Sequence, residues 1–350
     1  SASVVQTLSL TGTNGVSEIH IENGLLSRAA AVIGETFSPS RIHIVSDSTV
    51  APLYLQKLEQ QFTLPVTHTI IPAGEEHKRL STVEGIYHDL LANGMTRKDL
   101  IVALGGGVVG DITGFAAATF LRGVSLCQIP TTLLAQVDSS VGGKTGVDLP
   151  EGKNLVGAFY QPRLVLIDPS VLTTLPEQTF ADGMAEVVKY GYISNRDILD
   201  MVSAPDYKQN IESIICECVK IKRDVVTIDE HDTGLRMILN FGHTIGHAAE
   251  KLGNYVDLTH GQAVAVGMVA AMRLSAFLGN EDLTGRLIDI LKHIGLPTEL
   301  NYDRESIFHA LLSDKKKFGA TVNFILVREA GRAEITPIDA EKLHEYVLKL

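Results

Sequence analysis

The first half of the chain alternates short β-rich runs with stretches of helical periodicity, and this alternation limits the fold more than any other feature. The runs read RIHIVSDS, VTHTIIPAG, DLIVALGGG, SLCQIPTT and LVLID. Between the second and third, apolar residues recur at helical spacing from Leu80 to Leu91, and the sequence Ala92-Asn93-Gly94 supplies a helix stop. Repeats of strand and helix are typical of a parallel sheet covered by helices. We therefore predict a Rossmann-like α/β domain.

The pattern changes near Pro176. Strand signals become sparse, and apolar residues take helical periods in GMAEVVKYGYI, IESIICECVKIKRDVV and GQAVAVGMVAAMRLSAFLG. The uncharged segment from Ala263 to Met272 is about half a membrane span, so we expect a buried helix there. The predicted organisation is an α/β domain in residues 1–176, followed by a mainly α-helical domain in residues 177–350.

Composition narrows the class of function. The 350 residues are 45% hydrophobic and 20% charged, which is typical of a globular protein. The net charge is −11 and the basic residues form no run, so we predict no nucleic-acid partner and no membrane partner. Three cysteines are too few for a disulfide framework, and the N-terminus has no secretory pattern. We expect a reduced, cytoplasmic protein.

A glycine-rich turn follows the third β-rich run. Gly105 to Gly110 satisfies the G-x-G-x-x-G pattern between a strand and a helix, where backbone amides can bind a pyrophosphate. Alone the match is weak, because the next run ends in Thr131-Thr132 rather than in an acid. An acid, Asp47, does end the first run. A tight turn without a ligand is the alternative, and the acidic and lysine residues of Gly74–Lys78 favour NAD.

A second glycine-rich segment, DSSVGGKTG, presents Lys144. Its ending is that of a phosphate-binding P-loop, but the first glycine of that motif would fall at Asp138, so the motif fails. Lys153 and Asn154 follow in EGKNLVG. Cations on glycine-flanked backbone can approach an anionic substrate closely, and solvated loop lysines are the alternative interpretation.

Two histidines four residues apart, His243 and His247, would share one face of a helix, although such pairs are most often ordinary core or surface residues. Glu186 lies among apolar residues three positions before Lys189. Either these two form a surface salt bridge, or Glu186 is buried and needs a metal or cation. His260 precedes the expected buried helix. One Glu and two His are typical of a catalytic zinc site, so a fourth candidate would have another role.

In chain order, six stretches resemble the 3-dehydroquinate synthase family of sugar phosphate cyclases: GGGVVGD, QIPTTLLAQVDSSVGGKTGV, EGKNLVGAFYQP, GMAEVVKYG, LNFGHTIGHAAE and HGQAVAVGM. The resemblance extends from about Asp47 to the DKK run at Asp314–Lys316. It implies a shikimate-pathway lyase that converts 3-deoxy-D-arabino-heptulosonate 7-phosphate to 3-dehydroquinate and phosphate. The implied cofactors are NAD and a divalent metal, Zn²⁺ or Co²⁺. The implied steps are transient oxidation by NAD, β-elimination of phosphate, re-reduction and aldol closure.

The resemblance also implies roles for individual residues. The metal ligands correspond to Glu186, His243 and His260. The NAD contacts correspond to Asp47, Glu75, Lys78, Gly106, Gly107, Val108, Asp111, Thr131, Thr132 and Thr174. The catalytic and substrate residues correspond to Asp138, Lys144, Lys153, Asn154, Lys189, Lys222, Arg236, Asn240, His247 and Lys316. Arg122 matches a position that reaches the active site of a neighbouring subunit, which implies a homodimer.

One departure and three rival interpretations accompany the resemblance. The family commonly has Glu where this chain has Gln262, so a charge beside His260 is expected to be missing. The rivals are another sugar phosphate cyclase, a metal- and NAD-dependent polyol dehydrogenase, and a non-catalytic nucleotide- or metal-binding protein. Asn240, Lys222 and the DKK run favour dehydroquinate synthase, because the substrates of the other cyclases lack a carboxylate.

Overall fold

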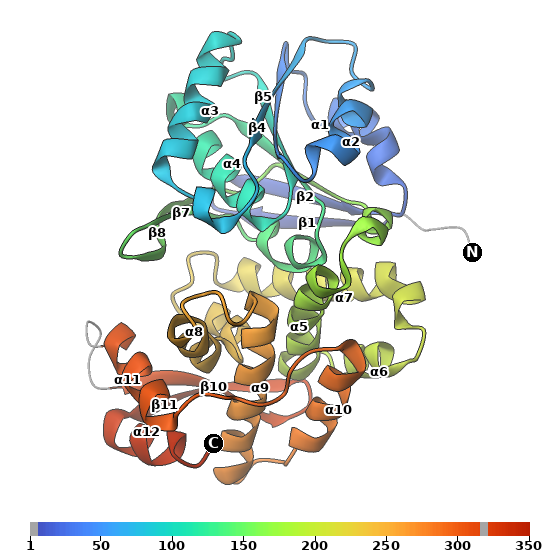
Figure 1. The fold of residues 1–350 in the computed structure, drawn as a ribbon. Helices are drawn as coiled ribbons and strands as arrows, with labels where there is room; N and C mark the ends of the chain where they lie inside the picture. The colour runs from blue at the N-terminus through green and yellow to red at the C-terminus, as the bar shows by residue number, and fades with distance from the viewer. Residues whose placement is uncertain (1–5, 316–320) are drawn as a thin grey trace. The chain divides into compact units, whose positions relative to one another are not determined.

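The computed structural model describes residues 6–315 and 321–350 and divides the chain into two compact units (Figure 1). The first unit extends to Leu175 and includes Lys222–His231, and the second comprises Pro176–Ile221 and Asp232–Leu350. The segment Lys222–His231 was expected in the second domain. Helix α7 (Ile211–Ile228) continues through this boundary without a break, so no local sequence pattern marks it. Glu230 accepts hydrogen bonds from the backbone N–H and hydroxyl of Thr13, which ties the segment to the first unit.

The first unit is built on a seven-stranded sheet in the order β1-β2-β9-β6-β5-β3-β4 (Figure 1). The five β-rich runs form its parallel strands, which confirms the predicted α/β fold. A hairpin that we did not predict, β1 and β2, joins this sheet beside β9. The strands are β1 (Gln6–Gly12), β2 (Gly15–Ile21), β3 (Ile42–Asp47), β4 (Val66–Ile71), β5 (Leu100–Gly105), β6 (Ser125–Pro130) and β9 (Leu164–Ile167).

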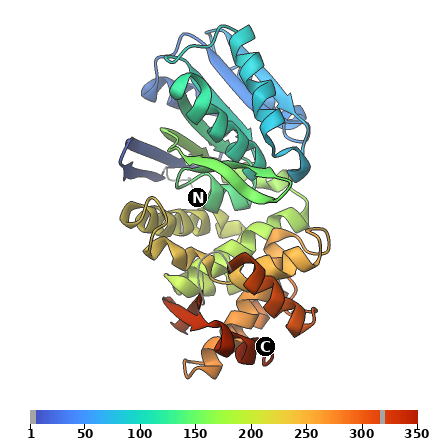
Figure 2. The same cartoon turned by 90° about the vertical axis from the view of Figure 1, so that its left-hand side faces the viewer.

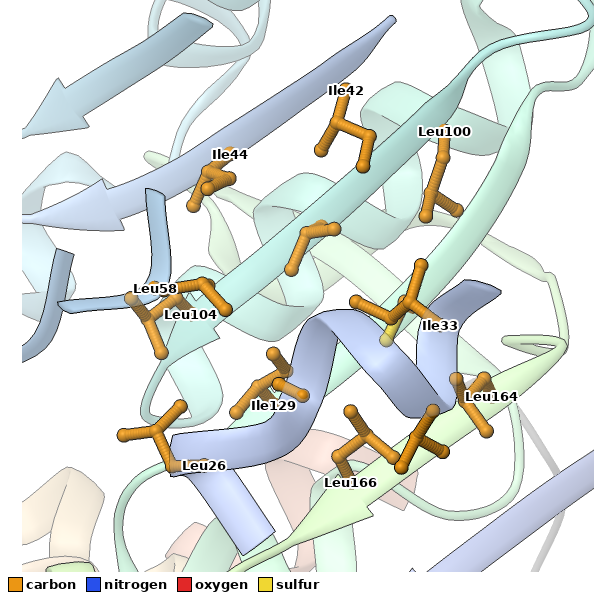
Figure 3. Close-up of a cluster of buried hydrophobic side chains, with 14 of the residues drawn as sticks. Leu26, Ile33, Ile42, Ile44, Leu58, Leu100, Leu104, Ile129, Leu164 and Leu166 are labelled. Carbon is orange, nitrogen blue, oxygen red and sulfur yellow. The ribbon is translucent and has the colours of Figure 1, made fainter. Parts of the chain in front are cut away.

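Helices cover both faces of the sheet because its central strands bury both faces. Leu100, Val102 and Leu104 of β5 pack in one core with α1 (Ala29–Thr36) and α2 (Ala51–Glu59), as Figure 3 shows for Leu100 and Leu104. Ile101 and Ala103 pack on the other face with α3 (Leu80–Ala92) and α4 (Gly107–Thr119). In Figure 1 the sheet lies between α1 and α2 on one side and α3 and α4 on the other, and Figure 2 looks onto the side of α3 and α4. Strands buried on both faces read as continuous apolar runs, which is why the sequence identified them.

His43 is a buried polar residue of β3. Its two ring nitrogens, Nδ1 and Nε2, lie 2.6 and 2.7 Å from the hydroxyls of Thr67 and Thr69 on β4. The Thr69 hydroxyl also donates to the Asp89 carboxylate at 2.6 Å. Burial lowers the pKa of His43 to about 4, although the negative charge of Asp89 acts in the opposite direction.

We expect His43 to make stability depend on pH. The ordinary pKa of 6.5 is retained in the unfolded chain, so the unfolded state gains a proton first as pH falls. His43 therefore costs the fold nothing above pH 6.5 and about 2–3 kcal/mol once the pH has fallen to about 4. Urea unfolding of His43→Gln should lose this part of the decline. His68→Gln, which changes a half-exposed histidine of β4, should retain it, and equal pH profiles for His43→Gln and the parent would contradict the assignment.

The second unit is mainly helical, as predicted, with one hairpin that the sequence analysis missed. A core joins α8, α9, α11 and α12 to the hairpin strand β10 through residues that include Ile245, Val266, Ile307, Phe324 and Leu343. The elements are α5 (Glu177–Ile193), α6 (Asp197–Ser203), α8 (His243–Leu252), α9 (His260–Phe277), α10 (Thr284–Ile294), α11 (Arg304–Lys315), α12 (Ala340–Val347), β10 (Thr321–Glu329) and β11 (Arg332–Asp339). Within the described ranges, no helix has the length and apolar character to cross a membrane.

Helix α9 touches two neighbouring helices at the level of the backbone. A Cβ placed on Gly267 of α9 would lie 2.0 Å from the carbonyl oxygen of Gly242, directly before α8. A Cβ placed on Gly261 would lie 2.3 Å from the Cα of Asp182 on α5. Only glycine permits both approaches. They hold the residue before α8 against the middle of α9, and the first turn of α9 against α5 at Asp182.

Candidate metal centre and cofactor residues

Glu186 is a fully buried carboxylate on α5. It lies among the buried residues Met184, Val187 and Val188, and its side chain is 0% exposed. Its Oε2 lies 2.5 Å from the Nζ of Lys189, which is itself 1% exposed. The surface salt bridge considered from the sequence is therefore excluded. Burial raises the pKa of Glu186, but the positive charges and hydrogen bonds around it, Lys189 foremost, hold that pKa well below its ordinary value.

Two histidines from other helices meet the same carboxylate oxygen. The Nε2 atoms of His243 and His260 lie 3.1 and 3.2 Å from Oε1 of Glu186. The three donor atoms are within 4.8 Å of one another. They come from α5, α8 and α9, and His243 and His260 are the first residues of their helices. The close packing of α9 on α5 and α8 thus assembles the donor set.

The hydrogen bonding of His243 fits a cation at this point. Its Nδ1 lies 3.0 Å from the carbonyl oxygen of Phe241, which can only accept a hydrogen bond, so Nδ1 carries the proton. The Nε2 atom faces the Glu186 carboxylate, which also only accepts, so either a proton on Nε2 or a bound cation must lie between the two atoms. A metal ion at this point would take the Nε2 lone pair of the neutral ring. One carboxylate and two imidazoles are ligands that zinc prefers.

His247 lies close to the rings of His243 and His260, but it is not part of the group formed with Glu186. Its ring centroid is 5.6 Å from that of His243 and 6.4 Å from that of His260. A donor atom of His247 also lies within 4.8 Å of donor atoms of Glu250 and His260. The four-residue spacing therefore did indicate a shared region. Distance alone does not decide the role of His247, which stays a prediction.

In the first unit, the glycine-rich turn joins β5 to α4. Gly106 precedes the helix and Gly107 begins it, with Val108 and Asp111 in the turns that follow. A Cβ on Gly106 would lie 3.1 Å from the methyl group of Thr132, and one on Gly107 would lie 3.2 Å from the Ser139 hydroxyl. Close packing therefore explains part of the glycine pattern. The open backbone at the start of α4 remains suited to a phosphate group.

Other predicted cofactor residues lie at the ends of the strands. Thr131 donates its backbone N–H to the Gly105 carbonyl at 3.0 Å, so the ends of β5 and β6 are adjacent. Asp47 ends β3, and its Oδ1 accepts the backbone N–H groups of Thr49 and Val50 before α2. Thr174 lies 2.7 Å from the hydroxyl of Tyr54.

Lys78 connects two other predicted residues, Asp111 and Asn154. Its Nζ donates to Asp111 Oδ2 at 2.8 Å and to Asn154 Oδ1 at 2.6 Å, and its side chain is 5% exposed. Burial lowers the pKa of Lys78, but Asp111 and other acids raise it by more, so the amine stays charged. Burial raises the pKa of neighbouring Glu75, helped by a hydrogen bond to Asp148.

Asp148 was missed by the sequence analysis. Its Oδ1 accepts the backbone N–H of Asn154 at 2.8 Å, and its own N–H donates to the Lys78 carbonyl at 2.8 Å. Asn154 has a positive φ of 56°, a conformation that such a bond helps to hold. An acid in the same hairpin as the Lys153-Asn154 pair was the available signal.

The remaining basic residues of the first unit differ in exposure. Lys222 is buried and donates to both the carbonyl and the Oδ1 of Asp138, each at 2.6 Å. Lys144 and Lys153 are exposed on the hairpin formed by β7 (Lys144–Leu149) and β8 (Gly152–Phe159). Arg122 is exposed at a turn where its own φ is 66°.

In the second unit, Lys189 and Arg236 are buried and Asn240 is exposed. Arg236 and Asn240 belong to one 3-10 helix, Leu235–Asn240, directly before α8. Lys316 lies outside the described residues.

Two protein-family models match consecutive parts of this chain. Residues 68–182 match the family described as 3-dehydroquinate synthase N-terminal, and residues 183–317 match 3-dehydroquinate synthase C-terminal. The 3-dehydroquinate synthase of Clostridium acetobutylicum is 44% identical over 346 residues, covering 96% of this chain and 97% of the relative.

The chain belongs to the 3-dehydroquinate synthase family.

The resemblance predicted from the motifs is thus confirmed, and with it a lyase of the shikimate pathway. The 3-dehydroquinate synthase of Streptococcus sanguinis is 43% identical over 343 residues, covering 95% of this chain and 97% of the relative.

Solved structures of other sugar phosphate cyclases have the same fold. A 2-deoxy-scyllo-inosose synthase complexed with carbaglucose-6-phosphate, NAD+ and Co2+ matches with a TM-score of 0.85 and 28% identity, covering 98% of this chain and 99% of the other. A 2-epi-5-epi-valiolone synthase from Streptomyces hygroscopicus with NAD+ and Zn2+ bound gives 0.84 and 25%, covering 95% and 96%. A probable glycerol dehydrogenase from Sinorhizobium meliloti gives 0.61 and 14%, covering 93% and 94%, which shows a shared fold alone.

Gln262, where this chain departs from the family's common Glu, has a local structural role. Its Oε1 accepts the backbone N–H of Thr259 at 3.1 Å, and the Thr259 hydroxyl accepts the backbone N–H of Gln262 at 3.3 Å. This reciprocal capping box begins α9, and either Gln or Glu forms it. The side chain at this position is therefore engaged with the backbone rather than with His260.

Proposed function

We propose that this chain converts 3-deoxy-D-arabino-heptulosonate 7-phosphate to 3-dehydroquinate and phosphate, with NAD and a divalent metal, zinc or cobalt. The observation that carries the proposal is the convergence of His243 and His260 on one oxygen of buried Glu186. Membership of the family supports the substrate, and the two cyclase structures with NAD+ and Co2+ or Zn2+ support the cofactors.

Glu186, His243 and His260 would hold the metal. The bound metal would polarise substrate hydroxyl groups while NAD accepts and returns a hydride. Lys189 remains beside Glu186 as a fixed positive charge, at 2.5 Å from Oε2. It limits the negative charge of the donor set and can orient an anionic substrate group.

We assign NAD to the start of α4 and the adjacent strand ends. Gly106 and Gly107 would offer backbone N–H groups to the pyrophosphate, with Val108 in the same turn. Asp111, Lys78 and Glu75 form the polar cluster beside it. Asp47, Thr131, Thr132 and Thr174 complete the assignment from the ends of β3 and β6 and the turn after β9.

We assign the charged groups of the substrate to fixed cations and amides. Lys144 and Lys153 suit its phosphate, whose own oxygen can collect the proton lost in β-elimination. Buried Arg236 suits the carboxylate because a guanidinium binds it through two parallel hydrogen bonds. The other assigned residues are Asp138, Asn154, Lys189, Lys222, Asn240, His247 and Lys316.

Phosphate release tests the proposal against its rivals. Protein with NAD, zinc and the heptulosonate phosphate should release phosphate with no net change in NADH absorbance, and a metal chelator should stop the release. A polyol dehydrogenase would accumulate NADH with its product. Turnover of sedoheptulose 7-phosphate or glucose 6-phosphate in place of the heptulosonate would instead favour another cyclase. No turnover of any of the three would favour a binding protein.

We also propose a homodimer in a reducing, cytoplasmic setting. Arg122 supports the dimer, because it is exposed and follows Leu121 in a turn where both residues have positive φ, of 66° and 51°. Two non-glycine residues in this conformation cost free energy, and such strain is found where a side chain is held for a purpose. That purpose would be contact with a second copy. The three cysteines are free and buried, in keeping with a reducing compartment.

A further inference from the structure

Glu250 is a second buried carboxylate near His260. It lies near the end of α8, its side chain is 8% exposed, and its Oε1 lies 3.5 Å from Nδ1 of His260. The opposite ring nitrogen, Nε2, lies 3.2 Å from Oε1 of Glu186. The His260 imidazole therefore lies between two buried carboxylates, with one at each nitrogen.

A metal-binding imidazole needs a partner on its other nitrogen. The neutral ring has one lone pair, and the remaining nitrogen carries a proton that requires an acceptor. For His243 the acceptor is the Phe241 carbonyl, 3.0 Å from Nδ1. For His260 the acidic oxygen at Nδ1 belongs to Glu250. Both histidines would thus present Nε2 toward Glu186.

We propose that Glu250 is the positioning residue of this metal centre: it accepts the Nδ1 proton of His260 and so keeps the Nε2 lone pair directed at the point shared with His243 and Glu186. This inference rests on the metal site proposed above. Gln262 does not fill the role, because its side chain caps α9. The second carboxylate at His260 comes from another helix, α8.

Direct ligation by Glu250 is the alternative, since donor atoms of Glu250, His247 and His260 also lie within 4.8 Å of one another. The geometry at His260 favours positioning. Glu250 faces Nδ1, whereas Glu186 faces Nε2. A neutral imidazole cannot offer a lone pair on both sides, so a metal held with Glu186 leaves Glu250 as the proton acceptor.

The test measures zinc affinity by competition with a chromogenic chelator. Glu250→Gln keeps the side-chain shape, but its amide can either accept or donate, so it no longer dictates which nitrogen carries the proton. We expect the zinc dissociation constant to rise about 10- to 100-fold, the usual loss when such a partner is removed. Glu250→Asp, which restores the charge on a shorter side chain, should recover part of the affinity. Thermal unfolding of the metal-free proteins checks that each variant folds.

Two control variants test whether the change in zinc affinity depends on the position of Glu250 or only on the charge of the protein. Glu305→Gln makes the same change in an exposed carboxylate–imidazole pair, where Oε1 lies 2.8 Å from Nε2 of His344. Gln262→Glu adds an acid while preserving the capping box. Both should bind zinc as the parent does. An equal loss in Glu305→Gln would overturn the proposal, because it would make the effect unspecific.

A spectroscopic readout follows the proton itself. In the cobalt-loaded parent, proton NMR should show exchangeable Nδ1–H signals for His243 and His260. Glu250→Gln should lose the His260 signal to faster exchange with water and keep the His243 signal, with the visible cobalt bands unchanged. If Glu250→Gln changed the visible cobalt bands and lost as much metal as Glu186→Gln, Glu250 would be a metal ligand. That result would overturn its proposed role as a positioning residue. Parent-like zinc affinity in Glu250→Gln overturns it too, whereas a parent without zinc would refute the metal site itself.

Discussion

His243→Ala and Glu186→Ala are expected to lose the bound metal and at least about 1000-fold in phosphate-release rate, which corresponds to about 4 kcal/mol. Each variant removes one of three donor atoms that lie within 4.8 Å of one another, and two donors hold zinc far less tightly. His243→Ala is the cleaner test. Glu186→Ala also leaves buried Lys189 without its carboxylate, so its thermal unfolding must be checked.

His247→Ala is the matched comparison, and we expect it to keep the metal while losing about 100-fold in rate. Metal content after dialysis, measured by mass spectrometry, separates the two outcomes. His309→Ala, which changes an exposed histidine of α11, should keep both metal and rate. If His247→Ala proved as empty as His243→Ala, His247 would be a ligand and the assignment of roles would be wrong.

The contrast between these histidines shows what spacing can predict. Residues four apart on a helix share a face, and His243 and His247 do lie together. Spacing does not say which ion or substrate each ring serves. Glu186 is 57 residues from His243 in the chain, and only the packing of three helices brings them together. That packing depends on glycines such as Gly267, whose purpose is invisible without the neighbouring helix.

Glu250 and Gln262 show what a local sequence pattern cannot predict. The sequence directed attention to Gln262 because it lies two residues from His260, yet its side chain turns back to cap α9. Glu250, near the end of α8 and ten residues before His260, reads as an ordinary helix-end acid. Its burial results from tertiary contacts that no local pattern reports. Local motifs pointed to the three proposed ligands, whereas the partner proposed for His260 could be found only from the fold.

The parallel sheet could be predicted for a related reason. A strand buried on both faces must be apolar at nearly every position, so β3, β5, β6 and β9 leave a clear record in the sequence. The hairpin of β10 and β11 is partly exposed and alternates less clearly, and it follows a long helical region. Its strands were therefore read as part of a helical domain.

Lys78→Met is expected to lower the free energy of unfolding by about 3–5 kcal/mol, the usual cost of removing one partner from a buried ion pair. The amine lies 2.8 Å from Asp111 Oδ2 and 2.6 Å from Asn154 Oδ1, and it is 5% exposed. Without it, Asp111 loses the hydrogen bond and the positive charge that Lys78 supplies at the start of α4. Binding of NAD should weaken as well, since Asp111 and Lys78 both belong to the proposed cofactor site.

The pH dependence of this variant identifies the cause. Burial already raises the pKa of Asp111 above its ordinary 3.8, and loss of the Lys78 charge raises it further. The folded variant then holds a proton that the unfolded chain has released, so its stability falls as pH rises above about 4. Urea unfolding at acidic and neutral pH should show this fall, and Lys78→Met/Asp111→Asn should recover part of the loss at neutral pH. Lys57→Met, at an exposed position of α2, should be neutral. If the double variant were no more stable than Lys78→Met, the loss of stability would come from the packing of the Lys78 side chain rather than from its charge.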